Sequence, residues 1–191
     1  MSRGRHAVVH VLGLDPGLAN TGFALLTGER LSAPPELRDL GVYTSDKDAS
    51  LRDRVTELCR DLSPLMGVNV VVVESPNFPR GSKAAAMVWA AFALIHGLCA
   101  GRALLVVRTP GEWRRMLGLP ARPEREAGER KDDTRKLMQR RFPQAAAFLV
   151  ELQADKHEHA TDALAIACSY WDCGAESAAT YRRDTQDQQA R

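Results

Sequence analysis

The chain has 191 residues, of which 45% are hydrophobic and 26% are charged, and this composition fits a soluble globular domain large enough to bury a substantial core. Its longest weakly polar segment, residues 84–105, is interrupted by His96, Gly97 and Arg102 and falls short of the ~20 apolar residues that cross a bilayer. The four cysteines lack Cys-x-x-Cys and zinc-finger spacing, and no secretory signal pattern opens the chain. We therefore expect a cytoplasmic protein without a membrane span.

Positive charge is concentrated in one part of the chain. Residues 108–141 contain eleven Lys or Arg against six Asp or Glu, whereas the remaining residues include 15 basic and 18 acidic ones. Clustered cations suit a polyanion such as DNA, because phosphate contacts release counterions. The alternative is a solvated helix face crossed by ion pairs, which a charge run taken alone would favour.

Five segments have the alternation or the β-branched composition of strands: residues 7–14, 21–27, 37–43, 68–73 and 104–107. Asp15-Pro16-Gly17 supplies a turn after the first of them, so the first two should pair as a hairpin. The run at residues 68–73 is typical of a strand buried on both faces. Leucines and a valine recur at helical spacing over residues 50–65, between the third and fourth strands.

The helix expected at residues 81–100 is apolar nearly all round. A helix without a polar face must be covered on more than one side. One side can pack on the sheet. For the other side, a second subunit and the protein's own C-terminal helices are equally good covers on the sequence alone.

The C-terminal half is expected to be mainly helical. Helices are predicted from the cap Thr109 to about Gly118, at residues 130–142 and 144–154, and then in an apolar segment that begins near His159. Residues beyond 172 are polar, so we expect one domain over residues 1–172 and a disordered tail over residues 173–191. The order of elements predicts an α/β fold with a mixed sheet, in which three antiparallel strands precede parallel ones and helices flank both faces.

Acidic residues stand at the ends of these elements. Asp15 closes the first strand and Glu74 closes the fourth, while His159 and Asp162 lie about 60° apart around the C-terminal helix. That helix buries a stripe predicted at Ala160, Ala163, Leu164, Ala167, Cys168 and Trp171, and Glu158 shares the polar border with Asp162. Each residue alone could be a turn former, a strand-end charge or a helix cap. Together they indicate a metal-dependent active site, because hard divalent cations need several oxygen ligands from separate elements.

Three motifs resemble those of one nuclease family. They are Leu12-Gly13-Leu14-Asp15-Pro16-Gly17 with Asn20-Thr21-Gly22, Val71-Val72-Val73-Glu74, and His159-Ala160-Thr161-Asp162-Ala163-Leu164-Ala165-Ile166-Ala167. In this order they resemble the motifs of RuvC-type Holliday junction resolvases, which are ribonuclease H-like nucleases, and the resemblance covers residues 8–171. It implies a ribonuclease H-like fold and an endonuclease that resolves four-way DNA junctions by paired symmetric nicks.

The resemblance also implies roles for individual residues. Asp15, Glu74 and Asp162 match the family's metal-binding carboxylates, and His159 stands where the fourth active-site residue is aspartate or histidine. Glu158 could supply an oxygen in place of His159. The implied reaction is phosphodiester hydrolysis with two Mg²⁺ ions, for which Mn²⁺ can substitute. Lys131 resembles the basic residue that the family places near the scissile phosphate.

The resemblance implies partners as well. The side chains expected to contact DNA are Phe78, which resembles the aromatic residue that stacks at the opened junction, together with Arg80, Lys83, Arg114, Arg115, Arg130, Lys131 and Arg135. A homodimer through the helix at residues 81–100 would face two identical sites toward a two-fold symmetric junction. A branch-migration helicase is left open as a partner. The turn at residues 110–113 and the charged loop after it resemble viral or divergent members of the family.

Three competing functions remain on the sequence alone. An ATPase of the actin and sugar-kinase class shares an Asp-x-Gly loop, but it needs a second phosphate loop and an adenosine site, for which this chain is short. A ribonuclease H-like enzyme acting on another branched DNA or on an RNA/DNA hybrid would use the same carboxylates. A catalytically silent junction-binding module would cut nothing in the presence of Mg²⁺.

Overall fold

The computed structural model describes residues 8–29, 33–76, 83–119 and 127–189, with the side chains of residues 83–84, 127–131 and 174–189 excepted. A single sheet has the order β3-β2-β1-β4-β5 and consists of β1 (Val9–Asp15), β2 (Asn20–Gly28), β3 (Glu36–Thr44), β4 (Val70–Glu74) and β5 (Leu104–Arg108). The first three strands are antiparallel, and β4 and β5 run parallel to β1. The predicted mixed sheet is confirmed.

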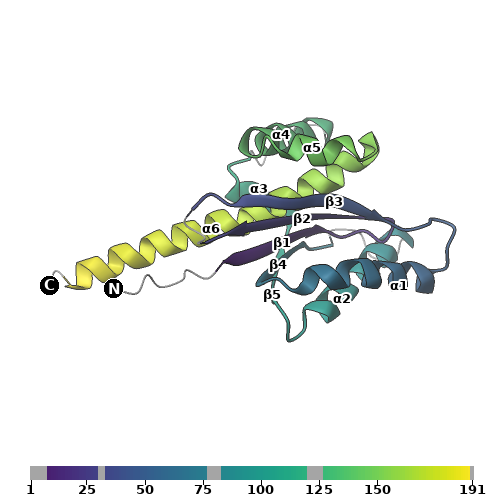
Figure 1. Cartoon of the computed structure of the whole chain (residues 1–191), viewed down its shortest axis with the longest axis horizontal. Helices are drawn as coiled ribbons and strands as arrows, with labels where there is room; N and C mark the ends of the chain where they lie inside the picture. The colour runs from purple at the N-terminus through teal and green to yellow at the C-terminus, as the bar shows by residue number, and fades with distance from the viewer. Residues whose placement is uncertain (1–7, 30–32, 77–82, 120–126, 190–191) are drawn as a thin grey trace.

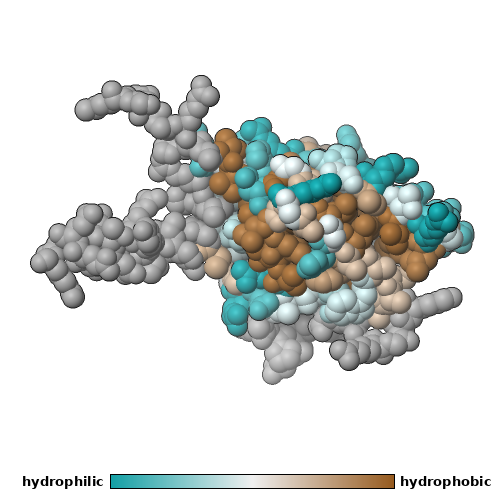
Figure 2. Space-filling model, turned by 90° about the horizontal axis from the view of Figure 1, so that it is seen from below, coloured by the Kyte–Doolittle hydropathy of each residue, from teal (hydrophilic) through white to brown (hydrophobic). Residues whose placement is uncertain are grey.

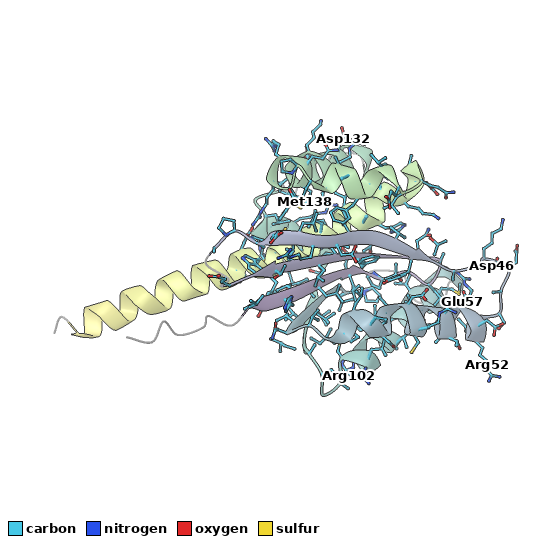
Figure 3. All side chains as sticks on the ribbon, viewed as in Figure 1. Asp46, Arg52, Glu57, Arg102, Asp132 and Met138 are labelled. Atoms are coloured by element: carbon cyan, nitrogen blue, oxygen red, sulfur yellow. The ribbon has the colours of Figure 1, made fainter. Side chains whose placement is uncertain are left out.

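Helices cover both faces of the sheet (Figure 1). On one face lie α1 (Leu51–Leu62) and α2 (Lys83–Cys99), and on the other lies α6 (His157–Gln189), followed outward by α3 (Pro110–Met116), α4 (Ala127–Arg141) and α5 (Ala145–Val150). Short 3₁₀ turns, Ser63–Met66 and Ala154–Lys156, precede β4 and α6. In Figure 3, Met138 of α4 lies between the outer helices and the sheet, whereas Arg52 and Arg102 lie at the opposite side of the molecule.

The alternation of side chains along the strands produces two separate cores. Val11, Val70 and Val72 pack with α6 and the outer helices. Their sequence neighbours Leu12 and Val71 point the other way and pack with α1 and α2. Successive strand residues point to opposite faces, so every second residue of β1 and β4 belongs to the α6 face. Asp15 and Glu74 continue this series at the ends of their strands.

Two glycines allow α6 to lie directly on the sheet backbone. A Cβ atom at Gly13 of β1 would lie 2.2 Å from the carbonyl oxygen of Ala163, and one at Gly22 of β2 would lie 2.0 Å from that of His159. Real Cβ atoms do not approach so closely, so both positions exclude every other residue type in this arrangement. The opening motif thus brings the helix within contact of β1 and β2.

The apolar stripe of α6 is confirmed, because its six predicted residues, Ala160, Ala163, Leu164, Ala167, Cys168 and Trp171, are all buried. The end of the chain differs from the prediction. α6 continues to Gln189, where the sequence had indicated disorder from residue 173. Beyond Gly174 this segment contains no proline and is rich in Ala, Gln and Arg, which favour helix. Its polarity is as typical of a helix as of a disordered tail.

The position of α2 excludes one of the two covers expected for this helix. α6 and α3 to α5 lie on the opposite face of the sheet, so the C-terminal helices do not cover α2, and that alternative is wrong (Figure 1). α2 packs on the sheet through Ala91, Ile95 and Cys99 and against α1. Across the parts of the chain that are described, no helix combines the length and apolar character needed to span a membrane.

Candidate active site

Asp15 and Glu74 lie side by side because of strand register. β1 and β4 are adjacent and parallel, and Leu14 is paired with Val73, so the next residue of each strand stands at the same level. Both next residues point to the α6 face of the sheet, as the alternation of the two cores requires. The carboxyl ends of parallel strands are the usual ligand-binding edge of an α/β sheet.

The first turns of α6 add His159 and Asp162 to this edge. Gly22 is paired with Asp15 across β1 and β2, and it is also the glycine that contacts the backbone of His159. His159 is thereby placed over the end of β1. Its Nδ1 donates a hydrogen bond to Oδ2 of Asp15 at 2.7 Å. The structure therefore brings together two residues that are 144 positions apart.

The contact with Asp15 changes the acid–base properties of His159. The hydrogen bond to Asp15 raises the pKa of the imidazole, burial opposes this rise, and the charges of Asp15, Glu158 and Asp162 add to it. A protonated His159 places a positive charge against a carboxylate that is only 18% exposed. In this conformation Nδ1 is occupied, which leaves Nε2 as the nitrogen that could bind a cation.

Glu74 is held by a residue that the sequence did not single out. The indole Nε1 of Trp113, in α3, donates a hydrogen bond of 2.6 Å to Oε2 of Glu74. Burial and then the charge of Asp15 raise the pKa of Glu74 to about 7, against the lowering effects of the Trp113 hydrogen bond and the charge of Arg114. Glu74 is thus a carboxyl group that is difficult to ionise without a nearby cation.

Asp162 is in a similar electrostatic situation. Burial raises its pKa to about 7, the charges of Asp15, Glu74 and Glu158 act in the same direction, and Arg114 opposes them. Each of the three carboxylates Asp15, Glu74 and Asp162 therefore influences at least one of the others. Such mutual repulsion is typical of sites at which like charges are gathered for a function.

Arg114 connects this acidic group to α4. Its Nη1 donates to Oγ1 of the fully buried Thr134 at 3.1 Å, and its guanidinium carbon lies 4.5 Å from the centre of a Trp113 ring. The sequence placed Arg114 among residues that contact DNA, whereas in the structure its charge acts on Glu74 and Asp162. Thr134 and Trp113 were missed. The available signal for Trp113 was its place one helical turn after β5, the strand that neighbours β4.

The other residues expected to contact DNA are placed only in part. Arg115 is exposed on α3, and Arg135 is exposed on α4, where it is paired with Asp132. Arg135 also lines a cavity of about 240 Å³ with Glu158 and Asp162. Phe78 and Arg80 lie outside the described residues, and so do the side chains of Lys83, Arg130 and Lys131.

Among the residues that the structure describes, no three His, Cys, Asp or Glu side chains stand in an arrangement ready to hold a metal ion. One oxygen of Asp15 is engaged by His159 and one oxygen of Glu74 is engaged by Trp113. The site in this state is an acidic cluster in which neighbouring protein groups hold one oxygen of Asp15 and one oxygen of Glu74.

Comparisons with known proteins bear on the family. No protein-family model matches the chain. The curated crossover junction endodeoxyribonuclease RuvC of Synechococcus sp. (strain RCC307) is 29% identical over 170 residues, which cover 85% of this chain and 98% of the relative. The structure of RuvC from T. thermophilus in complex with a Holliday junction substrate matches with a TM-score of 0.64 at 18% identity, covering 87% of this chain and 94% of that one.

The chain is similar to RuvC proteins over most of its length. The Fowlpox virus resolvase, solved with a Holliday junction DNA, has the same fold with a TM-score of 0.60 at 16% identity, covering 86% of this chain and 98% of the viral one. The RuvC-type fold of this chain is therefore shared with bacterial and viral proteins alike. In it, the predicted residues Asp15, Glu74, His159 and Asp162 converge at one edge of the sheet.

Proposed function

We propose that this RuvC-type protein is a structure-selective endodeoxyribonuclease that resolves four-way DNA junctions by paired symmetric nicks. The observation that carries the proposal is the convergence of Asp15, Glu74 and Asp162 at the carboxyl edge of the sheet. The similarity to a crossover junction endodeoxyribonuclease along 85% of the chain supports the choice of substrate.

We further infer that the three carboxylates hold divalent cations, two Mg²⁺ ions per site, with Mn²⁺ as a substitute. The donor set fits this group, because oxygen ligands suit Mg²⁺ and because burial, followed by the charge of Asp15, raises the pKa values of Glu74 and Asp162, an effect that a bound cation would oppose. When bound, such ions supply activation of water and stabilisation of the leaving 3′ oxygen in phosphodiester hydrolysis. His159, through Nε2, or Glu158 would complete the site.

The protein's own groups have separable tasks in this proposal. Asp15 lies between the other carboxylates and interacts electrostatically with both, so it is our choice for the central ligand. Arg114, anchored by Thr134, contributes positive charge beside the acids, where it can offset charge that develops on the scissile phosphate. Lys131 stays a candidate for the same task on the resemblance alone.

We propose that two copies associate through α2. The space-filling view of the α1 and α2 side shows a broad apolar area (Figure 2). Within that side Trp89 is 46% exposed and packs edge-on against Phe92, and Val107 of β5 is 42% exposed. Contiguous apolar surface of this kind marks an association site. A two-fold dimer would direct one active site at each of two symmetric strands.

The test is cleavage of a labelled synthetic four-way junction in Mg²⁺, Mn²⁺ or EDTA, analysed on a denaturing gel. We expect symmetric nicks near the crossover with either ion and none in EDTA. Asp15→Asn should abolish cleavage while leaving junction binding intact. Preferred cutting of a flap or an RNA/DNA hybrid would reassign the substrate, and the absence of any ion-dependent cutting would identify a binding module.

A further inference from the structure

We propose that Trp113 is a positioning residue for the metal site: its indole N–H holds Oε2 of Glu74 and thereby turns the other carboxylate oxygen toward the cations. This inference rests on the proposed function, because it assigns a task within the same site. The observation behind it is the 2.6 Å hydrogen bond from Nε1 of Trp113 to Oε2 of Glu74.

Trp113 is well suited to hold another side chain in place because its own position is fixed. Its side chain is 1% exposed and belongs to the same core cluster as Met138 of α4 and Phe142, the residue that follows α4. The helix that carries it is fixed at its start by a capping box, in which Thr109 and Glu112 exchange hydrogen bonds. α3 follows directly on β5, and the last residue of β5, Arg108, is paired with Glu74 in the sheet.

Glu74 needs such a partner. Its long side chain ends beside the charge of Asp15, which repels the ionised carboxylate and would favour rotamers directed away from the site. The hydrogen bond to Trp113 opposes that rotation. A ligand held in one orientation binds a cation with less loss of conformational freedom, and hydrogen-bonded partners of metal ligands typically change metal affinity about 10–100-fold.

The chemistry of the donor is also suitable. An indole N–H can only donate, and it carries no formal charge. A lysine or arginine in this place would orient Glu74 equally well but would neutralise the carboxylate and compete with the cation. Trp113 therefore fixes the geometry of Glu74 while its negative charge stays available to the metal.

The experiment replaces Trp113 by 3-benzothienylalanine, which keeps the size and shape of the ring system but lacks the N–H group. The matched control is the same replacement at Trp171, which is also 1% exposed and whose Nε1 donates to the carbonyl oxygen of Ala33 at 2.7 Å. Both changes remove one buried indole hydrogen bond, but only the first touches a carboxylate of the site. Trp113→Phe serves as a second, genetically encoded variant.

Mn²⁺ affinity is measured on the DNA-free full-length proteins by electron paramagnetic resonance, and junction cleavage is measured as a function of Mg²⁺ concentration. We expect the Trp113 replacement to weaken Mn²⁺ binding about tenfold or more, with cleavage recovered at high Mg²⁺ and junction affinity unchanged. The Trp171 replacement should leave Mn²⁺ affinity at the wild-type value.

Equal Mn²⁺ affinities for wild type and both Trp113 variants would overturn the inference, and so would an equal weakening by the Trp171 control. The binding measurement contains no DNA, so it separates this inference from the proposed function. A wild-type protein that cuts no four-way junction, but whose Mn²⁺ affinity depends on the indole N–H, would refute the resolvase activity and support the positioning role. Cleavage of the junction by wild type, together with unaltered Mn²⁺ affinity in the Trp113 variants, would support the resolvase activity and refute the positioning role.

Discussion

Glu74→Gln should stabilise the metal-free protein at alkaline pH. The change keeps the shape of the side chain and an oxygen that can accept the indole hydrogen bond of Trp113, but it removes the buried charge. The pKa of Glu74 rises from 4.5 to about 7 in the fold, and at about 1.4 kcal/mol for each tenfold change this difference corresponds to about 3 kcal/mol. The native state binds the proton more tightly than the unfolded state does.

The sign of the pH dependence follows from that difference. Below pH 4.5 the carboxyl is protonated in both states and has no pH-dependent effect, and between pH 4.5 and about 7 the native wild type loses stability progressively. The variant has no such loss. The free energy of unfolding of the variant, relative to wild type, should therefore increase by about 1–3 kcal/mol between pH 5 and pH 8.

The assay is urea unfolding in EDTA at several pH values between 5 and 8. Glu151→Gln, at an exposed position after α5, is the control and should give a difference that does not vary with pH. Adding Mg²⁺ at pH 8 should reduce the advantage of the Gln variant, because ligands that bind only the native state stabilise it. A difference between Glu74→Gln and wild type that is constant from pH 5 to pH 8 would refute this account of the site.

Three other predictions concern the pH profile, the packing of α6 and the dimer. At subsaturating Mg²⁺, the initial rate of junction cleavage should rise between pH 6 and pH 8, because Glu74 and Asp162, each with a pKa of about 7, must lose a proton to bind a cation. An initial rate that does not change with pH would contradict this. Gly22→Ala should lower the free energy of unfolding by about 2–4 kcal/mol in a denaturant titration, because its Cβ would lie 2.0 Å from the carbonyl oxygen of His159. The control Gly97→Ala in α2, where a Cβ would have no atom within 4 Å, should be neutral or stabilising. Trp89→Glu, on the apolar side of α2, should convert a dimer to a monomer in sedimentation velocity without changing Mn²⁺ binding, and an unchanged sedimentation coefficient would place the interface elsewhere.

Much of the fold was predictable from the sequence because the strands and the C-terminal helix have strong periodic patterns. The burial of β4 on both faces and the stripe of α6 follow from such patterns. The meeting of Asp15 and Glu74 was predictable in outline, since both close strands of one parallel pair. The contact between His159 and Asp15 depends on how closely α6 approaches β2, and that distance is set by a tertiary contact at Gly22.

What could not be predicted depends on packing between elements distant in sequence. Trp113 and Glu74 are 39 positions apart, and their hydrogen bond requires both the β4–β5 pairing and the angle at which α3 leaves β5. A tryptophan in an amphipathic helix is ordinarily a core residue, which this one also is. The helical end of α6 was missed for another reason, because polar composition alone does not separate a surface helix from a disordered segment.

The close contact of α6 with Gly13 and Gly22 has a consequence for the substitutions that this protein can accept. Main-chain atoms, rather than interchangeable aliphatic groups, set the gap between helix and sheet at the point where His159 stands over Asp15. Repacking elsewhere in the interior should therefore leave the relative placement of these ligands almost untouched. A designer could vary most of the interior freely, provided that Gly13 and Gly22 are kept as glycines.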